Sequence, residues 1–211
     1  EAEGEGGSDL MRTHYSCETG MYRFIPHHVP RPVAVGTYKS RPNVHFFLME
    51  YVEMIDGDIP PPEPIIRPIV TLHRESLGKS PDGKFGSSVN SWFGHLVLPS
   101  VWEDSWEVWW TNHMKAVLAR EETRRGPHTP EDKELVETYI SKVLPRYLRP
   151  LETDGRSVTP CLVHTDLWPG NFKFKPDDET VIIFDSNTLW AHNERKPVLS
   201  TVVALFSNRR Q

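Results

Sequence analysis

Residues 161–194, CLVHTDLWPGNFKFKPDDETVIIFDSNTLWAHNE, decide the fold of this chain. Apolar runs at 161–163 and 181–184 are separated by turn-forming residues, so they predict two short strands. Each strand leads into a polar loop. Four polar residues stand out in these loops: His164, Asp166, Asn171 and, fourteen residues after Asn171, Asp185.

This set of residue types suits a phosphoryl-transfer site. Transfer of a γ-phosphoryl group requires a carboxylate beside the attacking hydroxyl and oxygen ligands for Mg²⁺ on the nucleotide phosphates. Asp166 has the chemistry of the proton acceptor. Asn171 and Asp185 offer the oxygen donors that magnesium prefers. His164, which we group with Asp166 as a catalytic residue, is expected to brace the loop.

The spacing matches the catalytic loop of kinases. HTDLWPGN at 164–171 fits the protein-kinase pattern H-R-D-x-x-x-x-N without a gap. Thr165 replaces the arginine of that pattern, and Asp185 is followed by Ser-Asn where protein kinases have Phe-Gly. These differences indicate a kinase of small molecules rather than a protein kinase.

HTDLWPGN, IIFD at 182–185 and LWAHNE at 189–194 together resemble the fructosamine/ketosamine-3-kinase family, in its fungal branch. The likeness covers roughly residues 10–194. Upstream segments agree with it: VPRPVAVGTY at 29–38, HFFLMEYVEM at 45–54, LHRES at 72–76, GKFG at 83–86, and the paired tryptophans Trp102 and Trp106.

The resemblance implies an α+β, protein-kinase-like fold and a defined reaction. The family phosphorylates the sugar 3-hydroxyl of ketosamines, such as fructosamine and ribulosamine adducts on protein lysines, with ATP and Mg²⁺, and so begins deglycation. By resemblance, Asp166 is the base and Asn171 and Asp185 hold magnesium. Trp168 is expected to stack on the apolar face of the sugar. The hinge that meets adenine through its backbone is expected at Glu50, Tyr51 and Val52.

Parts of the family pattern are not found. The chain has no glycine-rich phosphate loop followed by a strand that bears the phosphate-binding lysine, and everything after Glu194 leaves the pattern. The position of the family's lysine-pairing glutamate falls near His14, and Glu18, one helical turn later, is a candidate substitute. We therefore expect a chain truncated at both ends, with an N-lobe remnant over 1–56 and a mainly helical C-lobe over 57–211.

These departures leave a second function open, a catalytically impaired pseudokinase or fragment that binds nucleotide or substrate without turnover. A third reading is a sister kinase that acts on choline or aminoglycosides. The Leu167-Trp168 pair and the LWAHNE segment disfavour that reading.

Composition limits the classes of partner. A formal net charge of -5 and a pI near 6.1 argue against a nucleic-acid-binding protein. The sequence has no apolar run long enough to span a bilayer, and its two cysteines cannot form a disulfide framework or a zinc site of their own. We expect a cytoplasmic protein whose partners are ATP and glycated proteins or small ketosamines. The oligomeric state stays open.

The N-terminal third predicts a small sheet and one helix. Residues 1–8 are expected to fray, and Ser8 or Asp9 is expected to cap a helix that ends near residue 22. Strands at 33–38 and 44–50 should form a hairpin through a turn at 39–43. Prolines at 60–62 mark the crossing between lobes.

The middle of the chain predicts helices. A helix over 63–77 contains Pro68, a glycine-rich loop covers 79–98, and helices cover 102–123 and 130–148. Thr129 should begin the last helix, and Pro145 should kink it. Four tryptophans at helical spacing predict a buried stripe: Trp102, Trp106, Trp109 and Trp110.

Overall fold

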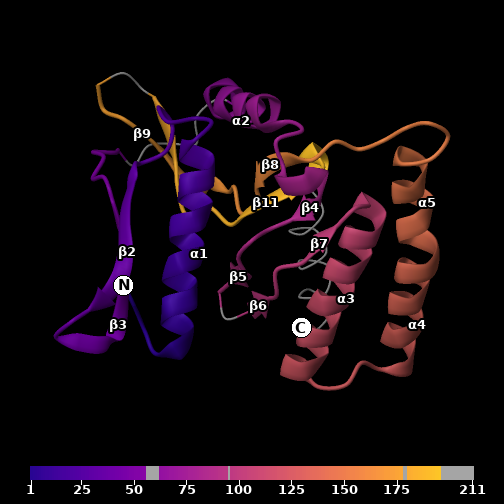
Figure 1. Cartoon of the computed structure of the whole chain (residues 1–211). Helices are drawn as coiled ribbons and strands as arrows, with labels where there is room; N and C mark the ends of the chain where they lie inside the picture. The colour runs from indigo at the N-terminus through magenta and orange to yellow at the C-terminus, as the bar shows by residue number, and fades with distance from the viewer. Residues whose placement is uncertain (56–61, 95, 178–179, 196–211) are drawn as a thin grey trace.

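The computed structural model of the chain describes residues 1–55, 62–94, 96–177 and 180–195. A small antiparallel sheet with helix α1 (Glu5–Tyr22) forms one side of the molecule, and a mainly helical part forms the other (Figure 1). This arrangement confirms the predicted α+β class. The expected boundary at 56 and 57, Pro60 and Pro61 of the crossing, and the tail from residue 196 onward lie outside the described residues.

The N-terminal sheet has the strand order β1-β3-β2, and both pairings are antiparallel. Its members are β1 (Ala2–Glu3), β2 (Pro32–Tyr38) and β3 (Arg41–Met49). Helix α1 packs on β2 and β3 (Figure 1). The predicted hairpin is confirmed, with a tighter turn at residues 39–40.

The expectation that residues 1–8 fray was wrong. Ala2 pairs with His45, and the N–H of Gly4 donates to the carbonyl of Asn43 at 3.0 Å, so the first residues are tied to β3. Gly4 has a φ of 80°, which lets the chain turn from strand into helix. The helix therefore begins at Glu5, ahead of the expected cap at Ser8 or Asp9. Tertiary pairing overrides the low helix propensity of this glycine-rich start.

The central sheet of the larger part has the order β7-β4-β11-β8, with all neighbours antiparallel. Its strands are β4 (Phe85–Gly86), β7 (Trp102–Glu103), β8 (Cys161–His164) and β11 (Thr188–Ala191). Two hairpins accompany it, β5 (Ser91–Phe93) with β6 (Leu96–Leu98) and β9 (Phe172–Phe174) with β10 (Val181–Ile183). The two strands predicted around the catalytic loop are confirmed as β8 and β10.

The prediction of a loop over 79–98 was wrong, because this segment contains the 3-10 turn Pro81–Gly83 and strands β4, β5 and β6. Strands of two or three residues are too short to show an alternating pattern. Gly86 in β4 pairs with Trp190 of β11, which is distant in the sequence, so the residues around Gly86 do not reveal this pairing.

Helix α2 (Pro62–Ser76) lies against β8 and confirms the helix expected near 63–77. Pro68 lies inside this helix and is fully buried. Helix α3 (Trp106–Arg125) begins at the N-cap Ser105, whose hydroxyl accepts from the N–H of Val108. Trp102 lies in β7, so its place in the predicted helical stripe was wrong. The stripe is confirmed for the buried residues Trp106, Trp109 and Trp110.

The last long helix is built in three parts: α4 (Pro130–Thr138), a π-helical turn (Tyr139–Val143) and α5 (Leu144–Leu148). Thr129 begins it through a capping box with Asp132, as predicted for the start of this helix. The π-helical turn precedes Pro145, which has no N–H for the helical ladder. The irregularity thus falls where a kink was expected.

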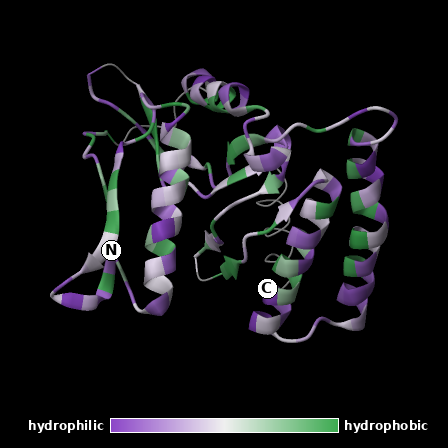
Figure 2. Ribbon diagram, viewed as in Figure 1, coloured by the Kyte–Doolittle hydropathy of each residue, from purple (hydrophilic) through white to green (hydrophobic). Residues whose placement is uncertain are grey.

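Two clusters of buried apolar side chains stabilise the region of the molecule around β8 and β10. One joins α3 and α5 to β8 and β11, and the other joins the end of α1 and α2 to β8, β9 and β10. Figure 2 shows β8 as one of the more hydrophobic segments. Among the described helices, none combines the length and hydropathy needed to cross a bilayer.

Candidate functional site

The candidate site lies where the chain leaves β8 and β10. These strands belong to different sheets, yet their ends are joined directly. His164 Nε2 lies 3.3 Å from the carbonyl oxygen of Phe184, and the N–H of Phe184 donates to the carbonyl of Asn171 at 3.0 Å. The loop after β8 and the loop after β10 therefore meet, as a site shared by Asp166, Asn171 and Asp185 requires.

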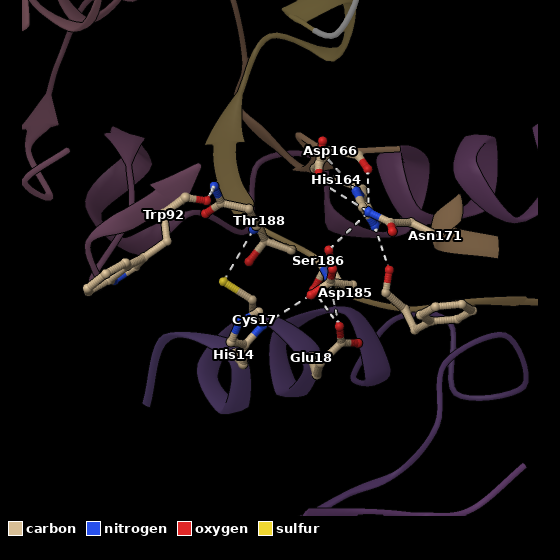
Figure 3. A network of polar contacts seen from close by, with 12 residues as sticks. His14, Cys17, Glu18, Trp92, His164, Asp166, Asn171, Asp185, Ser186 and Thr188 are labelled. Atoms are coloured by element: carbon tan, nitrogen blue, oxygen red, sulfur yellow. Dashed lines mark hydrogen bonds and ion pairs between the residues drawn. The ribbon is translucent and has the colours of Figure 1, made fainter. Parts of the chain in front are cut away.

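Asn171 connects the two carboxylate-bearing loops (Figure 3). Its buried side-chain amide donates from Nδ2 to the carbonyl of Asp166 at 2.8 Å and to Asp166 Oδ2 at 3.2 Å. The same nitrogen lies 3.5 Å from the carbonyl oxygen of Asp185. The structure thus brings Asp166, Asn171 and Asp185 together, with both carboxylates exposed.

His164 is buried beneath this loop. The backbone N–H of Asp166 donates to His164 Nδ1 at 3.1 Å. Because Nδ1 accepts a hydrogen bond, a neutral imidazole ring carries its proton on Nε2. The partner of Nε2 is the carbonyl oxygen of Phe184, at 3.3 Å. The imidazole therefore spans the two loops, which is the geometry expected of a brace.

Three side chains of helix α1 contact residues 185–188, and the sequence analysis had named His14 and Glu18 only as candidate positions for the family's lysine-pairing glutamate. Glu18 Oε1 accepts from the backbone N–H of Ser186 at 2.8 Å and from its hydroxyl at 3.1 Å. Cys17 Sγ accepts from the N–H of Thr188 at 3.2 Å, and His14 Nδ1 lies 3.5 Å from Asp185 Oδ1 (Figure 3). Their spacing along the helix, three and four residues, puts them on one face, and this was the available signal.

Burial changes the acid strength of all three of these groups. It raises the pKa of Glu18 to about 7, against the opposing effect of the hydrogen bonds from Ser186. Burial also lowers the pKa of His14, although the nearby carboxylate of Asp185 acts in the opposite direction. The face of α1 toward the loop is thus a partly desolvated environment.

A cavity of about 260 Å³ opens beside the two carboxylates. It lies between α1, the start of the β5–β6 hairpin and the loop that carries Asp185. The N–H group of the Asn187 side chain donates to the carbonyl of Trp92 at 3.0 Å and so ties the hairpin to that loop. The lining residues are Leu10, Thr13, His14, Trp92, Phe93, Gly94, Asp166, Asp185, Ser186 and Asn187.

A second cavity, of about 420 Å³, lies between α3 and α5 and is lined mainly by apolar residues such as Trp106, Trp110 and Tyr147. None of the predicted site residues lines it. The smaller cavity is therefore the candidate site, because Asp166 and Asp185 lie on its wall.

Trp168 lies in the catalytic loop, but it is not among the residues that line the candidate cavity. Its side chain is 57% exposed, and the end of the indole ring lies over Gly170. A β-carbon at residue 170 would overlap the ring, so glycine permits this position. The ring is thus available to a ligand on the outer side of the loop.

The predicted hinge, Glu50–Val52, directly follows β3. The backbone N–H of Glu50 donates to the carbonyl of Arg31 at 2.8 Å, and its carboxylate accepts from the N–H of Arg31 at 3.1 Å. Tyr51 is exposed. Farther on, the N–H of Ile55 donates to the Phe174 carbonyl at 2.9 Å, so this segment runs beside the β9–β10 hairpin.

Comparisons with known proteins agree with this architecture. A family model described as fructosamine kinase matches residues 15–209. A chloroplastic protein-ribulosamine 3-kinase from Oryza sativa subsp. indica is 28% identical over 169 residues, which are 79% of this chain and 44% of that protein. A probable ketoamine kinase from Synechocystis sp. is 26% identical over 166 residues, 79% of this chain and 50% of the relative. The chain thus spans about half the length of these relatives.

Two solved structures are similar in fold. A putative fructosamine-3-kinase from Haemophilus somnus superposes with a TM-score of 0.63 at 16% identity, over 91% of this chain and 58% of the other. A putative fructosamine-3-kinase from Thermobifida fusca gives a TM-score of 0.62 at 22% identity, over 98% and 62%. The expected protein-kinase-like fold is thereby confirmed.

Proposed function

Because the chain belongs to the fructosamine kinase family, we propose that it phosphorylates the sugar 3-hydroxyl of ketosamines with ATP, the step that begins deglycation. The acceptors are fructosamine and ribulosamine adducts on protein lysines, or the corresponding small ketosamines. One observation carries the proposal: Asn171 holds the Asp166 loop next to Asp185, on the wall of a cavity of about 260 Å³.

Asp166 is the proposed proton acceptor. Its carboxylate is exposed at the cavity, where the hydroxyl of an acceptor can reach it. Its backbone N–H is held by His164, and its carbonyl and one carboxylate oxygen are held by Asn171. Because these contacts fix the loop from behind, the carboxylate is oriented before the substrate arrives.

Asn171 and Asp185 are the proposed magnesium ligands. Their chemistry fits the ion, because an amide oxygen and a carboxylate are hard donors. The Asn171 nitrogen points to Asp166 and to the Asp185 carbonyl, so the amide oxygen is the atom left to face a metal. When bound with the nucleotide, magnesium supplies positive charge that offsets the charge on the phosphates.

ATP and the sugar are assigned to separate surfaces. Glu50–Val52 is the proposed hinge, and adenine would meet the backbone of Tyr51 and Val52, because the N–H of Glu50 already donates to Arg31. Trp168 is the proposed stacking residue for the sugar, consistent with its exposed ring. With these assignments, residues 1–56 act as the N-lobe and 57–211 as the C-lobe of a cytoplasmic kinase.

The test is phosphate transfer by the purified chain. We expect ADP release from Mg²⁺-ATP to depend on added fructosyl-lysine or ribulosyl-lysine. Asp166→Asn keeps the size of the side chain but removes the proton acceptor, so it should lower turnover by about 10²–10⁴-fold. ATP binding should remain. Equal turnover by the wild-type chain and Asp166→Asn would contradict the proposed role of Asp166.

A further inference from the structure

The peptide group between Asp185 and Ser186 is held at both ends. Its N–H donates to Glu18 Oε1 at 2.8 Å, and its carbonyl oxygen lies 3.5 Å from Asn171 Nδ2. The hydroxyl of Ser186 adds a second bond to the same oxygen of Glu18, at 3.1 Å. Figure 3 shows Glu18 reaching this peptide from α1, from the opposite side to Asn171. Glu18 thus contacts the backbone directly after the proposed metal ligand.

Asp185 has a backbone conformation that needs such support. Its φ is 55°, in the left-handed region that residues with a β-carbon rarely occupy. A conformation of this kind persists when the surrounding contacts over-determine it. The orientation of the 185–186 peptide sets the ψ of Asp185, so the bond from Ser186 to Glu18 restrains the backbone that aims the Asp185 carboxylate.

The environment of Glu18 is costly for a carboxylate. The side chain is 1% exposed, and Oε2 is buried without a hydrogen-bond partner among the described residues. An apolar side chain of similar size would avoid this desolvation. The two hydrogen bonds that the carboxylate accepts from Ser186 offset this desolvation cost, and no apolar side chain can accept them.

We infer that Glu18 is a positioning residue: its carboxylate fixes the Asp185–Ser186 peptide and thereby the aim of Asp185 toward Mg²⁺-ATP. The inference rests on the proposed function to the extent that Asp185 is the metal ligand. Replacing a residue that orients a metal ligand from behind typically changes metal affinity or activity by about 10–100-fold.

The test compares Glu18→Leu with Glu18→Gln in the absence of any sugar. The measured quantity is the Mg²⁺ concentration that gives half-maximal binding of a non-hydrolysable ATP analogue. We expect Glu18→Leu to raise it by about 10-fold or more, because Ser186 loses its acceptor. Glu18→Gln should stay close to wild type, since its amide oxygen still accepts from Ser186. Binding of the analogue without metal should be equal in all three.

Cys17→Ala is the matched control. It removes a neighbouring buried contact from α1, to Thr188 at the start of β11, and should leave the Mg²⁺ dependence unchanged. Hydrogen exchange in the metal-free protein gives a second readout, because the amide of Ser186 should exchange faster in Glu18→Leu than in wild type or Cys17→Ala. If Glu18→Leu lacks a cooperative unfolding transition, Glu18→Met serves in its place with the same expected shift.

The outcomes separate this inference from the proposed function. An unchanged Mg²⁺ dependence in Glu18→Leu overturns the inference. So does an equal shift in Cys17→Ala, because the role of Glu18 would then be general packing between α1 and the loop. A chain with the expected Mg²⁺ shift that transfers no phosphate to a ketosamine contradicts the proposed function and supports the positioning role.

Discussion

Ser76, the last residue of α2, joins this helix to the strand that leads into the catalytic loop. Its side chain is 0% exposed. The hydroxyl donates to the carbonyl of Leu72 at 2.6 Å and accepts from the backbone N–H of Leu162, in β8, at 2.8 Å. Because β8 is the edge strand of the central sheet, its outward N–H groups need partners from outside the sheet.

Ser76→Ala should therefore destabilise the fold by about 2 kcal/mol. The substitution leaves the buried N–H of Leu162 without its acceptor, a loss that typically costs about 1–3 kcal/mol. For a domain of this size, each kcal/mol lowers Tm by roughly 2–4 °C, so we expect a fall of about 4–8 °C.

Urea unfolding followed by circular dichroism measures this change as a shift in the midpoint with an unchanged m-value. Thr71→Ala is the matched control, because its hydroxyl bonds the Arg67 carbonyl at 2.9 Å on the exposed face of the same helix. Its effect should stay within about 0.5 kcal/mol. If the two variants lose equal stability, the reasoning from the unsatisfied Leu162 N–H is refuted.

Three further predictions concern separate features of the chain. Gly86→Ala should unfold the chain or destabilise it by at least about 3 kcal/mol in urea titrations, because φ is 145° and the new methyl group would overlap the Val101 carbonyl; a wild-type midpoint would contradict this. Burial raises the pKa of Cys17 and Cys161 to about 11, so both thiols should stay unreactive toward a disulfide reagent at pH 8 until urea is added. Rapid reaction of the folded chain would show that the two thiols are not buried. Trp168→Ala should raise the KM for a ketosamine by about 3–10-fold with ATP affinity unchanged, and equal losses for both ligands would exclude stacking on the sugar.

The sequence by itself determined the family, the α+β class and the segments whose signals are local. The catalytic stretch, the hairpin of β2 and β3, the capping box of Thr129 with Asp132 and the buried tryptophans of α3 depend on residues close together in the chain. Spacing and residue type are enough for such features, because each follows from the geometry of one helix, strand or turn. The predicted roles of the site residues, namely His164, Asp166, Trp168, Asn171, Asp185 and the hinge, remain predictions.

Only the tertiary structure decided which distant segments support the site. Strand β1 and strand β4 exist because β3 and β11 pair with them, and their few residues carry no pattern of their own. Glu18 and Ser186 are 168 residues apart, and nothing in either segment indicates their hydrogen bonds. The cavity beside Asp166 and Asp185 likewise has walls from four separate segments of the chain. Contacts of this kind arise when whole helices and strands pack together. The sequence of one segment therefore does not identify the distant segment that it contacts.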